Sequence, residues 1–513
     1  MLLPLLKKVY NKNLTEFSEM NRFPKRFMWG ISMAAFQYEM GASVEDSDPN
    51  SDWYVWVHDK TNIESKIASG DLPEQGPGYW RLYREDHRWA EWMGLNAWRM
   101  NPEWSRIFPK STKEVKVSVV SDEEGIKDVE VDEAALRKLD GLANKNAVRH
   151  YREIFKDVKA RRMKLILNLY HWPLPTWIHD PIRARETGLK EGPRGWFDND
   201  TVVEFSKFAA YAAWKFQDIV DMWSTLNEPS VTWNVGYMSN RFPPGVVDPK
   251  AAEHVAFNMV QAHCRAYDQI KRIVGKKAKV GVIYVTSPAE PLTDSEEDRK
   301  AAEICDEVST GWFFKAVIDG VIRKGFAGEE VKRRDLKSRV DWIGVNYYSR
   351  NVVKHVDQPP YFEAQKNYGF SCQPSSKSAA GRPTTETGWE IYPEGIRKAL
   401  NFYKKYEKPV IVAENGIADF RDKHRAWYLV SHLNNVLLAI KDGVNVVGYL
   451  HWSLIDNLEW VSGFNMRFGL IYVDMKTKRR YPRPSAYVYR DIVESNTLPE
   501  YLEEYSKYPN VLT

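Results

Sequence analysis

The stretch DMWSTLNEPS, residues 221–230, is a short apolar run that ends in a carboxylate and not in an ordinary turn residue. Seven further runs have the same form, an apolar segment followed by polar residues that are not turn formers. They are FMWGISMAAFQ (27–37), LNAWRMNPEW (95–104), KLILNLYHW (164–172), KVGVIYVTSP (279–288), DWIGVNYYSR (341–350), PVIVAENG (409–416) and VVGYLHWSL (446–454). Eight such runs are the number of strands that a closed parallel barrel needs.

Segments of helical character separate the apolar runs. Residues 198–220, for example, place apolar side chains three and four positions apart, as a helix with one buried face does. The runs themselves are rich in Val, Ile and Leu without strict alternation, which is typical of parallel strands buried on both faces. This alternation of strand and helix predicts an α/β fold, a single (β/α)8 TIM barrel with long βα loops.

The rival architecture is an open, doubly wound sheet. Such a sheet normally has a glycine-rich first turn, and the sequence contains neither GxGxxG nor a complete P-loop. Residues 320–325 have the glycine spacing of a P-loop, but Phe326 follows where a lysine is required. In a closed barrel the active site forms at the carboxyl ends of the strands, so we expect the polar residues after the eight runs to meet in one pocket.

The composition argues against several classes of function. Of 513 residues, 43% are apolar and 28% are charged, and no run of 18 apolar residues occurs, so we expect no membrane association. The net charge of +4 comes from basic residues scattered among acidic ones, which argues against nucleic acid as a partner. Three cysteines without a CxxC pair suit a reducing cytosol, with no disulfide frame and no zinc site. Because residues 1–13 place apolar residues before basic ones, the reverse of an export signal, we predict a cytoplasmic protein.

Two glutamates stand out among the strand-end residues. Glu228 and Glu414 each follow an apolar run directly, where a loop would ordinarily begin with Asp, Gly or Ser. Position alone leaves a structural role open, since a strand-end carboxylate can also cap a helix or pair with an arginine. Two carboxyl groups that face one pocket suit cleavage of a glycosidic bond, in which one protonates the leaving oxygen and the other supports the oxocarbenium-like transition state.

The neighbours of the two glutamates suggest different roles. Pro229 removes one backbone donor beside Glu228, so this side chain suits the acid role, which requires a raised pKa. Glu414 precedes an Asn-Gly pair that allows close backbone approach, and a nucleophile should stay ionised. Arg99, at the end of another run, is a candidate partner for the Glu414 carboxylate.

Five separated motifs carry a resemblance to a known protein family. TLNEP (225–229) and AENG (413–416) lie at the fourth and seventh predicted strands, and FMWGISMAAFQYEMG (27–41) lies at the first. GVNYY (344–348) and WSLIDNLEW (452–460) complete the set, so that the resemblance spans about residues 23–490. Together the motifs resemble glycoside hydrolase family 1, the retaining β-glycosidases, and SDWYVWVHD (51–59) is similar to the archaeal branch.

The resemblance implies a reaction and a role for each matching residue. The reaction would be hydrolysis of terminal non-reducing β-D-glucosyl, galactosyl or fucosyl residues from small glycosides by double displacement, with no metal and no cofactor. Glu228 would be the acid/base and Glu414 the nucleophile, with Arg99 and Tyr348 supporting the nucleophile. Trp452 would be the floor beneath the sugar ring, and Asn227 would bind the 2-hydroxyl. The full set of substrate-binding residues would be Gln37, His171, Trp172, Asn227, Asn346, Tyr348, Trp452, Glu459 and Trp460.

Some of these residues have a structural alternative, and one position departs from the family. His171 could be a core histidine bonded to the backbone, and Trp452 and Trp460 could be core bulk. Ala413 stands where the family commonly has Thr or Ser, so a hydrogen bond behind the nucleophile is in doubt. Glu459 is present, whereas branches that act on 6-phosphorylated sugars replace it, and a free sugar is therefore expected.

The resemblance also sets expectations for boundaries and assembly. Members of this branch often begin near Met20, so residues 1–19 are interpreted as a disordered extension or a misassigned start, and residues 20–513 as one catalytic domain. The archaeal branch suggests a heat-stable homotetramer. Two alternatives stay open: a β-mannosidase or transglycosylating relative, and a carbohydrate-binding barrel without catalysis. Aglycone preference depends on variable loops such as residues 355–385, where no motif guides a prediction.

Overall fold

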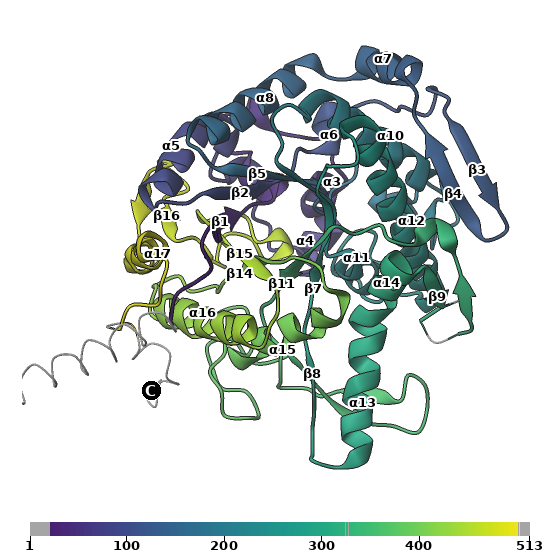
Figure 1. Ribbon diagram of the computed structural model, residues 1–513. Coiled ribbons are helices and arrows are strands. Elements are labelled where there is room, and N and C mark those ends of the chain that lie inside the picture. Colours follow the sequence, from purple (N-terminus) through teal and green to yellow (C-terminus); the bar gives the residue numbers. More distant parts are fainter. Residues whose placement is uncertain (1–20, 324, 327, 501, 503–513) are drawn as a thin grey trace, which may run out of the picture.

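Eight parallel strands close into a barrel at the centre of the computed structural model, which describes residues 21–323, 325, 326, 328–500 and 502 (Figure 1). Around the barrel the strands follow the order β1-β15-β14-β11-β7-β6-β5-β2. Their bounds are β1 Met28–Ser32, β2 Ala97–Met100, β5 Lys164–Tyr170, β6 Met222–Asn227, β7 Val280–Val285, β11 Trp342–Asn346, β14 Val410–Asn415 and β15 Val446–His451. Each of the eight predicted runs holds one of these strands, so the prediction of a (β/α)8 barrel is confirmed.

The interior of the barrel is filled by apolar side chains and leaves the carboxyl ends of the strands for the site. Every strand contributes to one buried cluster, whose members are Met28, Ala97, Ile166, Met222, Ile283, Trp342, Ile411, Ala413 and Leu450. The Trp342 ring fits because its neighbour on β7 is Gly281, where a Cβ atom would lie 2.5 Å from ring atoms of Trp342. Side chains that fill a barrel in this way make it a packed core and not a pore.

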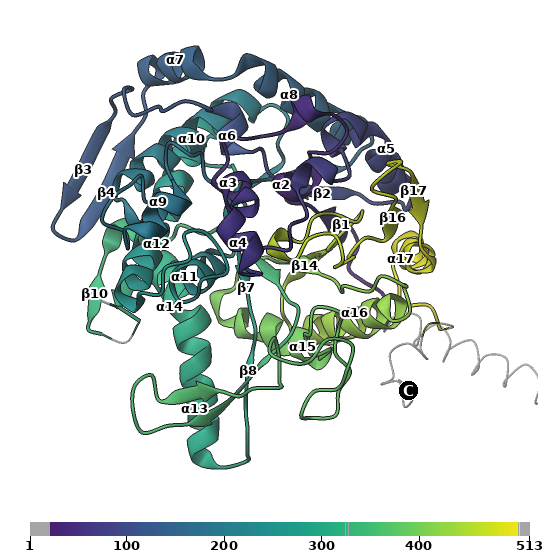
Figure 2. The same cartoon turned by 180° about the vertical axis from the view of Figure 1, so that it is seen from behind.

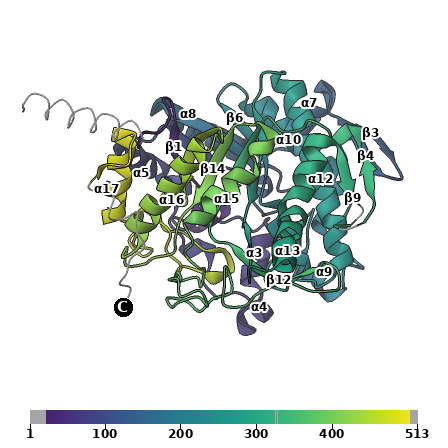
Figure 3. The ribbon, with the colours of Figure 1, turned by 60° about the horizontal axis from the view of Figure 1, so that its bottom comes forward.

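Helices surround the barrel and cover its outer face (Figures 1 and 2). Those that connect successive barrel strands or follow the last one are α5 Tyr79–Trp92, α8 Lys145–Ala160, α10 Asp200–Phe216, α12 Pro249–Val274, α13 Glu296–Asp306 with α14 Trp312–Phe314, α15 Glu394–Phe402, α16 Arg425–Lys441 and α17 Pro484–Ser495. The helix predicted within residues 198–220 is α10, whose four buried alanines allow the close approach of α12. Figure 3 shows α10 beside α12 and α15 beside α16 on the outside of the barrel.

The connections between strands and helices carry the remaining elements. The helices among them are α2 Ala35–Tyr38, α3 Asp52–His58, α4 Lys60–Glu64, α6 Trp104–Ile107, α7 Glu133–Leu142, α9 Pro181–Glu186 and α11 Pro229–Tyr237. The strands are β3 Ser118–Asp122, β4 Gly125–Glu130, β8 Ala289–Pro291, β9 Val321–Arg323, β10 Glu330–Lys332, β12 Asn351–His355, β13 Phe362–Ala364, β16 Ile471–Val473 and β17 Arg480–Pro482. These segments make the βα loops long, as predicted.

The last part of the described chain packs against the first helices. The hairpin β16–β17 lies beside α5 in Figures 1 and 2, and the buried Arg480 on β17 pairs with the buried Asp86 on α5, with Nε and Oδ1 2.9 Å apart. The predicted boundary at Met20 and the segment before it lie outside the described residues. Within the described part of the chain, no helix has both the length and the hydropathy that crossing a bilayer requires.

Candidate active site

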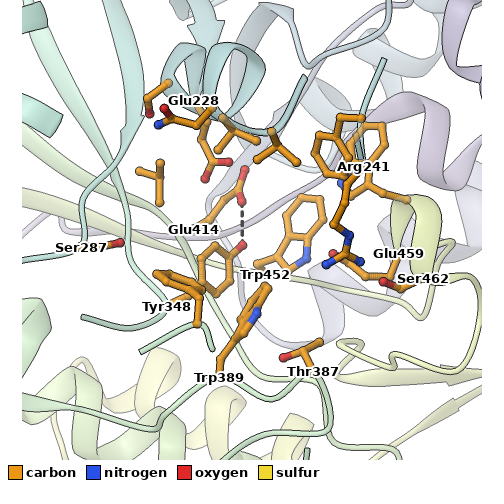
Figure 4. A pocket seen from close by; sticks show the side chains of 18 of the residues that line it. Glu228, Arg241, Ser287, Tyr348, Thr387, Trp389, Glu414, Trp452, Glu459 and Ser462 are labelled. Carbon is orange, nitrogen blue, oxygen red and sulfur yellow. Dashed lines mark hydrogen bonds between the residues drawn. The ribbon is translucent and has the colours of Figure 1, made fainter. Parts of the chain in front are cut away.

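A cavity of about 610 Å³ opens at the carboxyl ends of the barrel strands (Figure 4). Its size lies in the range of small-molecule sites. Eight of the residues predicted from sequence line it directly, namely His171, Trp172, Glu228, Tyr348, Glu414, Trp452, Glu459 and Trp460. The other four, Gln37, Arg99, Asn227 and Asn346, are buried and hydrogen-bonded to these lining side chains. The structure therefore brings together every residue that the sequence singled out.

Strand β14 presents Glu414 to the cavity because the strand is irregular at that point. The pairing register shifts between Val412 and Asn415 against β15, and again beside Glu414 against β11. Such irregularities next to active sites redirect a side chain that strict alternation would point elsewhere. Ala413 accordingly packs into the apolar interior of the barrel, while the next residue, Glu414, faces the cavity with 3% of its surface exposed.

Two donors hold the carboxylate of Glu414. Arg99 donates from Nη1 to one carboxylate oxygen, and the Tyr348 hydroxyl donates to the other over 2.7 Å, the dashed line in Figure 4. The fully buried guanidinium of Arg99 also donates to Ser32 Oγ at 2.6 Å and to Asn227 Oδ1 at 2.7 Å. A positive charge and a phenol that both donate to one carboxylate stabilise its anion.

Glu228 adopts a backbone conformation that is rare for a residue with a side chain. Its φ is 46° and its ψ is 57°, in the left-handed region, and Pro229 follows as the first residue of α11. Pro229 suits this place because proline at the first helical position is preorganised for a helix. Trp172 and Trp460, which also line the cavity, have positive φ values of 81° and 47°. Residues held in this region of backbone space cluster at functional sites.

The surroundings of the Glu228 carboxyl group differ sharply from those of Glu414. Only 5% of Glu228 is exposed, and its hydrogen-bond donor is a neutral amide, Asn346 Nδ2, 2.7 Å from Oε1. Burial raises the pKa of Glu228, and the negative charge of Glu414 raises it further. The pair therefore combines a carboxylate beside a cation with a carboxyl group that retains its proton near neutral pH.

Asn227 and His171 connect the two glutamates. Asn227 Oδ1 accepts from Arg99 and, at 3.1 Å, from Asn346 Nδ2, while its own Nδ2 lies 3.0 Å from His171 Nε2. Burial and the charge of Arg99 lower the pKa of His171 well below its ordinary value, so that the imidazole is neutral. Since His171 also lines the cavity, it is not a core histidine of the kind that the sequence left open.

Glu459 lines the cavity, and the buried Gln37 is hydrogen-bonded to it. Gln37 Nε2 donates to Leu458 O at 2.8 Å, to Asn457 Oδ1 at 3.0 Å and to Glu459 Oε2 at 3.3 Å. Burial raises the pKa of Glu459 to about 8, with a further contribution from the charge of Glu414. A neutral carboxyl group and an amide, side by side, are suited to uncharged hydroxyl groups.

Several buried polar atoms of the site have no hydrogen-bond partner among the described residues. They are Gln37 Oε1, Asn346 Oδ1 and Trp172 Nε1. Buried polar groups are usually hydrogen-bonded, so these two acceptors and one donor are available to a polar ligand. A sugar presents hydroxyl groups that can both donate and accept.

Trp452 approaches the strand end of β14 very closely. Its carbonyl oxygen would lie 1.6 Å from a Cβ atom placed on Gly416, so only glycine fits there. The prediction that the Asn-Gly pair after Glu414 allows close backbone approach is therefore confirmed. The Trp452 side chain is 3% exposed and lines the cavity beside both glutamates (Figure 4).

The sequence did not point to several residues that shape the site. Asn101 and Glu103 accept from the backbone N–H groups of Ala35 and Phe36, and thereby hold the short helix α2 that carries Gln37. The pattern NPEW contained both, but nothing local indicated their partners. The outer wall of the cavity was also missed, with Arg241, Phe242, Phe370, Glu386, Trp389, Met466 and Phe468 among its members. Across the described ranges, no cluster of His, Cys, Asp and Glu has the arrangement of a metal site.

Comparison with known proteins matches the chain to one family and to β-glycosidases of known structure. Residues 19–121 and 139–498 match the family model for glycosyl hydrolase family 1. The chain is similar to a β-galactosidase of Saccharolobus solfataricus, with 48% identity over 495 residues that cover 96% of this chain and 99% of the relative. It is also similar to the crystal structure of the β-glycosidase from the hyperthermophile Thermosphaera aggregans, with a TM-score of 0.89, 48% identity and coverage of 95% and 100%. A third likeness, with a TM-score of 0.87, 46% identity and coverage of 95% and 99%, is to a β-glucosidase mutant derived from a hyperthermophilic tetrameric structure.

Proposed function

The chain belongs to glycosyl hydrolase family 1, and from this premise we propose that it removes terminal β-linked glucosyl, galactosyl or fucosyl residues from small glycosides, with Glu414 as nucleophile and Glu228 as acid/base. The observation that supports this assignment most directly is the pairing of two buried carboxyl groups in opposite charge environments. One receives hydrogen bonds from a guanidinium and a phenol, and the other has a raised pKa and a single amide donor.

The proposed reaction has two steps. In the first, Glu414 attacks the anomeric carbon while Glu228 gives its proton to the aglycone oxygen, which leaves a glycosyl group on Glu414. In the second, Glu228 removes a proton from water, and the water attacks the same carbon from the opposite face to Glu414. Two inversions restore the original configuration. When Glu414 becomes bonded to the sugar in the first step, it loses its negative charge. Because that charge helps to raise the pKa of Glu228, the pKa of Glu228 then falls, and Glu228 can act as a base in the second step.

The sugar-binding assignments follow from which polar groups remain free for a ligand. Asn227 uses its oxygen for Arg99 and Asn346 and presents its amide near His171, which suits a hydroxyl next to the anomeric carbon. Glu459, with Gln37 bonded to it, suits the hydroxyls at the other end of the ring. Trp452 supplies an apolar face for the C–H groups of the sugar. Trp172 and Trp460 add indole donors to the same cavity.

A panel of chromogenic aryl β-glycosides tests the function. We expect turnover of the glucoside, galactoside and fucoside with a β-configured first product, and weaker turnover of the mannoside, whose 2-hydroxyl points to the other side of the ring. NMR of the product mixture within the first minutes gives the configuration. No turnover of any member would favour a carbohydrate-binding barrel, and preference for the mannoside would favour a β-mannosidase.

The raised pKa of Glu228 predicts an alkaline limit to activity. The acid role requires the protonated form, which is populated below the pKa and lost as pH rises through it. Because burial and Glu414 raise this pKa, we expect kcat/KM for a substrate with a poor leaving group to hold through neutral pH and to fall on the alkaline side. A pH profile of kcat/KM measures this limb, and Glu228→Gln should lack it with an activated substrate. A fall that is complete below neutral pH would contradict the assignment.

Oligomeric state, heat stability and cellular location are proposals that rest on similarity to other proteins or on the sequence alone. The similarity to a protein derived from a tetrameric structure supports a homo-oligomer, and a tetramer is the form we propose. The similarity to a protein from a hyperthermophile supports heat stability in the same way. A cytoplasmic location stays a prediction from the cysteine content.

A further inference from the structure

The outer part of the cavity contains a cation that the proposed reaction does not use. Arg241 lines the cavity and is exposed, and Figure 4 shows it on the side where Glu459 and Ser462 lie, across from Ser287 and Tyr348. Its backbone makes hydrogen bonds, but its guanidinium has neither a hydrogen bond nor an ion pair with any described residue. A guanidinium that points into a cavity without a partner is available to a ligand.

The backbone that carries Arg241 is held in place. Trp56, which is fully buried, donates from Nε1 to the Arg241 carbonyl oxygen at 3.1 Å. The next residue, Phe242, packs against Trp53 and Trp172, with ring centroids 4.8 and 5.2 Å apart. The guanidinium therefore extends from a fixed point on the rim, close to the aromatic wall of the cavity, and this reduces the entropic cost of holding a ligand there.

A second unpartnered donor lines the same cavity as Arg241. The backbone N–H of Phe242 donates to Val235 O at 3.3 Å, so the segment that carries Arg241 is bonded to α11, the helix that carries Asn234. Asn234 is exposed and lines the same cavity, and its amide makes no hydrogen bond to the described residues. A guanidinium and an amide that both present N–H groups are typical of sites for carboxylate or phosphate oxygens.

The acidic groups that line the cavity do not compete for this cation. Glu386 uses both carboxylate oxygens to accept from Phe420 N, each at 3.0 Å. Glu414 is paired with Arg99, and the raised pKa values of Glu228 and Glu459 favour their neutral forms near pH 7. An anionic group that enters beside Arg241 therefore meets a positive charge with which no carboxylate of the described residues forms an ion pair.

We propose that Arg241, with Asn234 as a second donor in the same cavity, selects glycosides whose aglycone carries a carboxylate or phosphate group. The inference rests on the proposed glycosidase function and adds the chemical class of aglycone to it. The exposure of the residues indicates which end of the substrate carries the anion. Arg241 is exposed, whereas Gln37 and His171, which hold the sugar in the proposed function, are 1% and 2% exposed. The anion therefore belongs to the part of the substrate that faces the entrance.

A pair of substrates of nearly equal shape tests the proposal. The β-glucosides of 4-hydroxybenzoate and of 4-hydroxybenzamide differ in charge at one end of the aglycone and little in size. The measured quantity is the ratio of kcat/KM for the anionic over the neutral substrate, in the wild type and in Arg241→Gln, Arg241→Lys and Arg88→Gln. Arg88, exposed on α5 outside the cavity, controls for the loss of one positive charge from the protein. The two leaving groups differ in intrinsic reactivity, but this difference is the same for every variant and therefore cancels when the ratios of the variants are compared.

We expect Arg241→Gln to lower this ratio roughly two- to fivefold, the effect of one partly exposed ion pair. The loss should shrink as sodium chloride is added, because salt screens exposed charges. Arg241→Lys should retain most of the ratio, and Arg88→Gln should leave it as in the wild type. An unchanged ratio in Arg241→Gln would overturn the proposal.

A second arm distinguishes the two ends of the substrate. The same variants are compared on 4-nitrophenyl β-glucoside with and without a 6-phosphate on the sugar. Sensitivity of this ratio alone to Arg241→Gln would assign Arg241 to a sugar phosphate and overturn the aglycone assignment. Failure of the wild type to hydrolyse the neutral benzamide glucoside would instead count against the proposed function, so the two failures are separate.

Discussion

Replacing Glu414 by alanine is expected to lower kcat/KM for aryl β-glucosides and β-galactosides by at least about 10⁴-fold, since the covalent step loses its nucleophile. The residue lines the cavity, and its carboxylate is held by Arg99 and Tyr348 at the position where attack would occur. Retention of even a tenth of the activity would contradict its assignment as nucleophile.

The control for this variant concerns stability. Glu414→Ala leaves the fully buried guanidinium of Arg99 without its carboxylate, and an unpaired buried charge costs roughly 3–5 kcal/mol of the free energy of unfolding. Glu414→Gln keeps an oxygen that can accept from Arg99, so it should be equally inactive but should unfold at a higher temperature than the alanine variant. Glu363→Ala, an exposed substitution on β13, should leave both activity and stability unchanged.

Chemical rescue gives a direct readout of the missing nucleophile. Alanine at position 414 leaves room beside Arg99 and Tyr348, whose donors would then face a small anion such as azide. Attack by azide on an activated aryl β-glucoside inverts the anomeric carbon once and yields the α-glycosyl azide. NMR of the product detects this configuration. A β-configured azide from this variant would place the nucleophile elsewhere.

Replacing Glu228 by glutamine is expected to have an effect that depends on the leaving group. For a glycoside with a poor leaving group, such as an alkyl glucoside, loss of the proton donor should cost about 10²- to 10⁴-fold in kcat/KM. For a 2,4-dinitrophenyl glucoside, whose phenolate leaves without a proton, the first step should be affected far less. The substitution should preserve the local structure. In the wild type, Asn346 Nδ2 donates to Glu228 Oε1 at 2.7 Å, and glutamine keeps an oxygen that can accept this hydrogen bond.

The second step supplies a further test of Glu228. Without a base, water attacks the glycosyl group on Glu414 slowly, so the activated substrate should give a burst of phenolate followed by a slow phase. Azide needs no base, and it should accelerate the slow phase and yield the β-glycosyl azide. Equal losses for good and poor leaving groups, together with no effect of azide, would contradict the acid/base role.

Much of the site followed from where polar residues fall in the chain. Each of the eight apolar runs became a barrel strand, and the polar residue after each run came to the same end of the barrel, because parallel strands in a closed barrel all point one way. Glu228 and Glu414 stand out in the sequence for this reason, since each directly follows an apolar run. The loops that form the outer wall, with Trp389 and Arg241, carried no comparable pattern, because their positions depend on distant packing partners.

The sequence by itself determined the barrel and the end of it at which Glu228 and Glu414 meet, since these depend on local periodicity and strand direction. Only the tertiary structure decided how the two carboxylates differ. A register shift in β14 turns Glu414 toward Arg99, and a left-handed backbone at Glu228 turns that side chain toward Asn346. The different surroundings of the two carboxyl groups come from partners 66 to 315 residues away in the chain, and no local pattern encodes such long-range contacts.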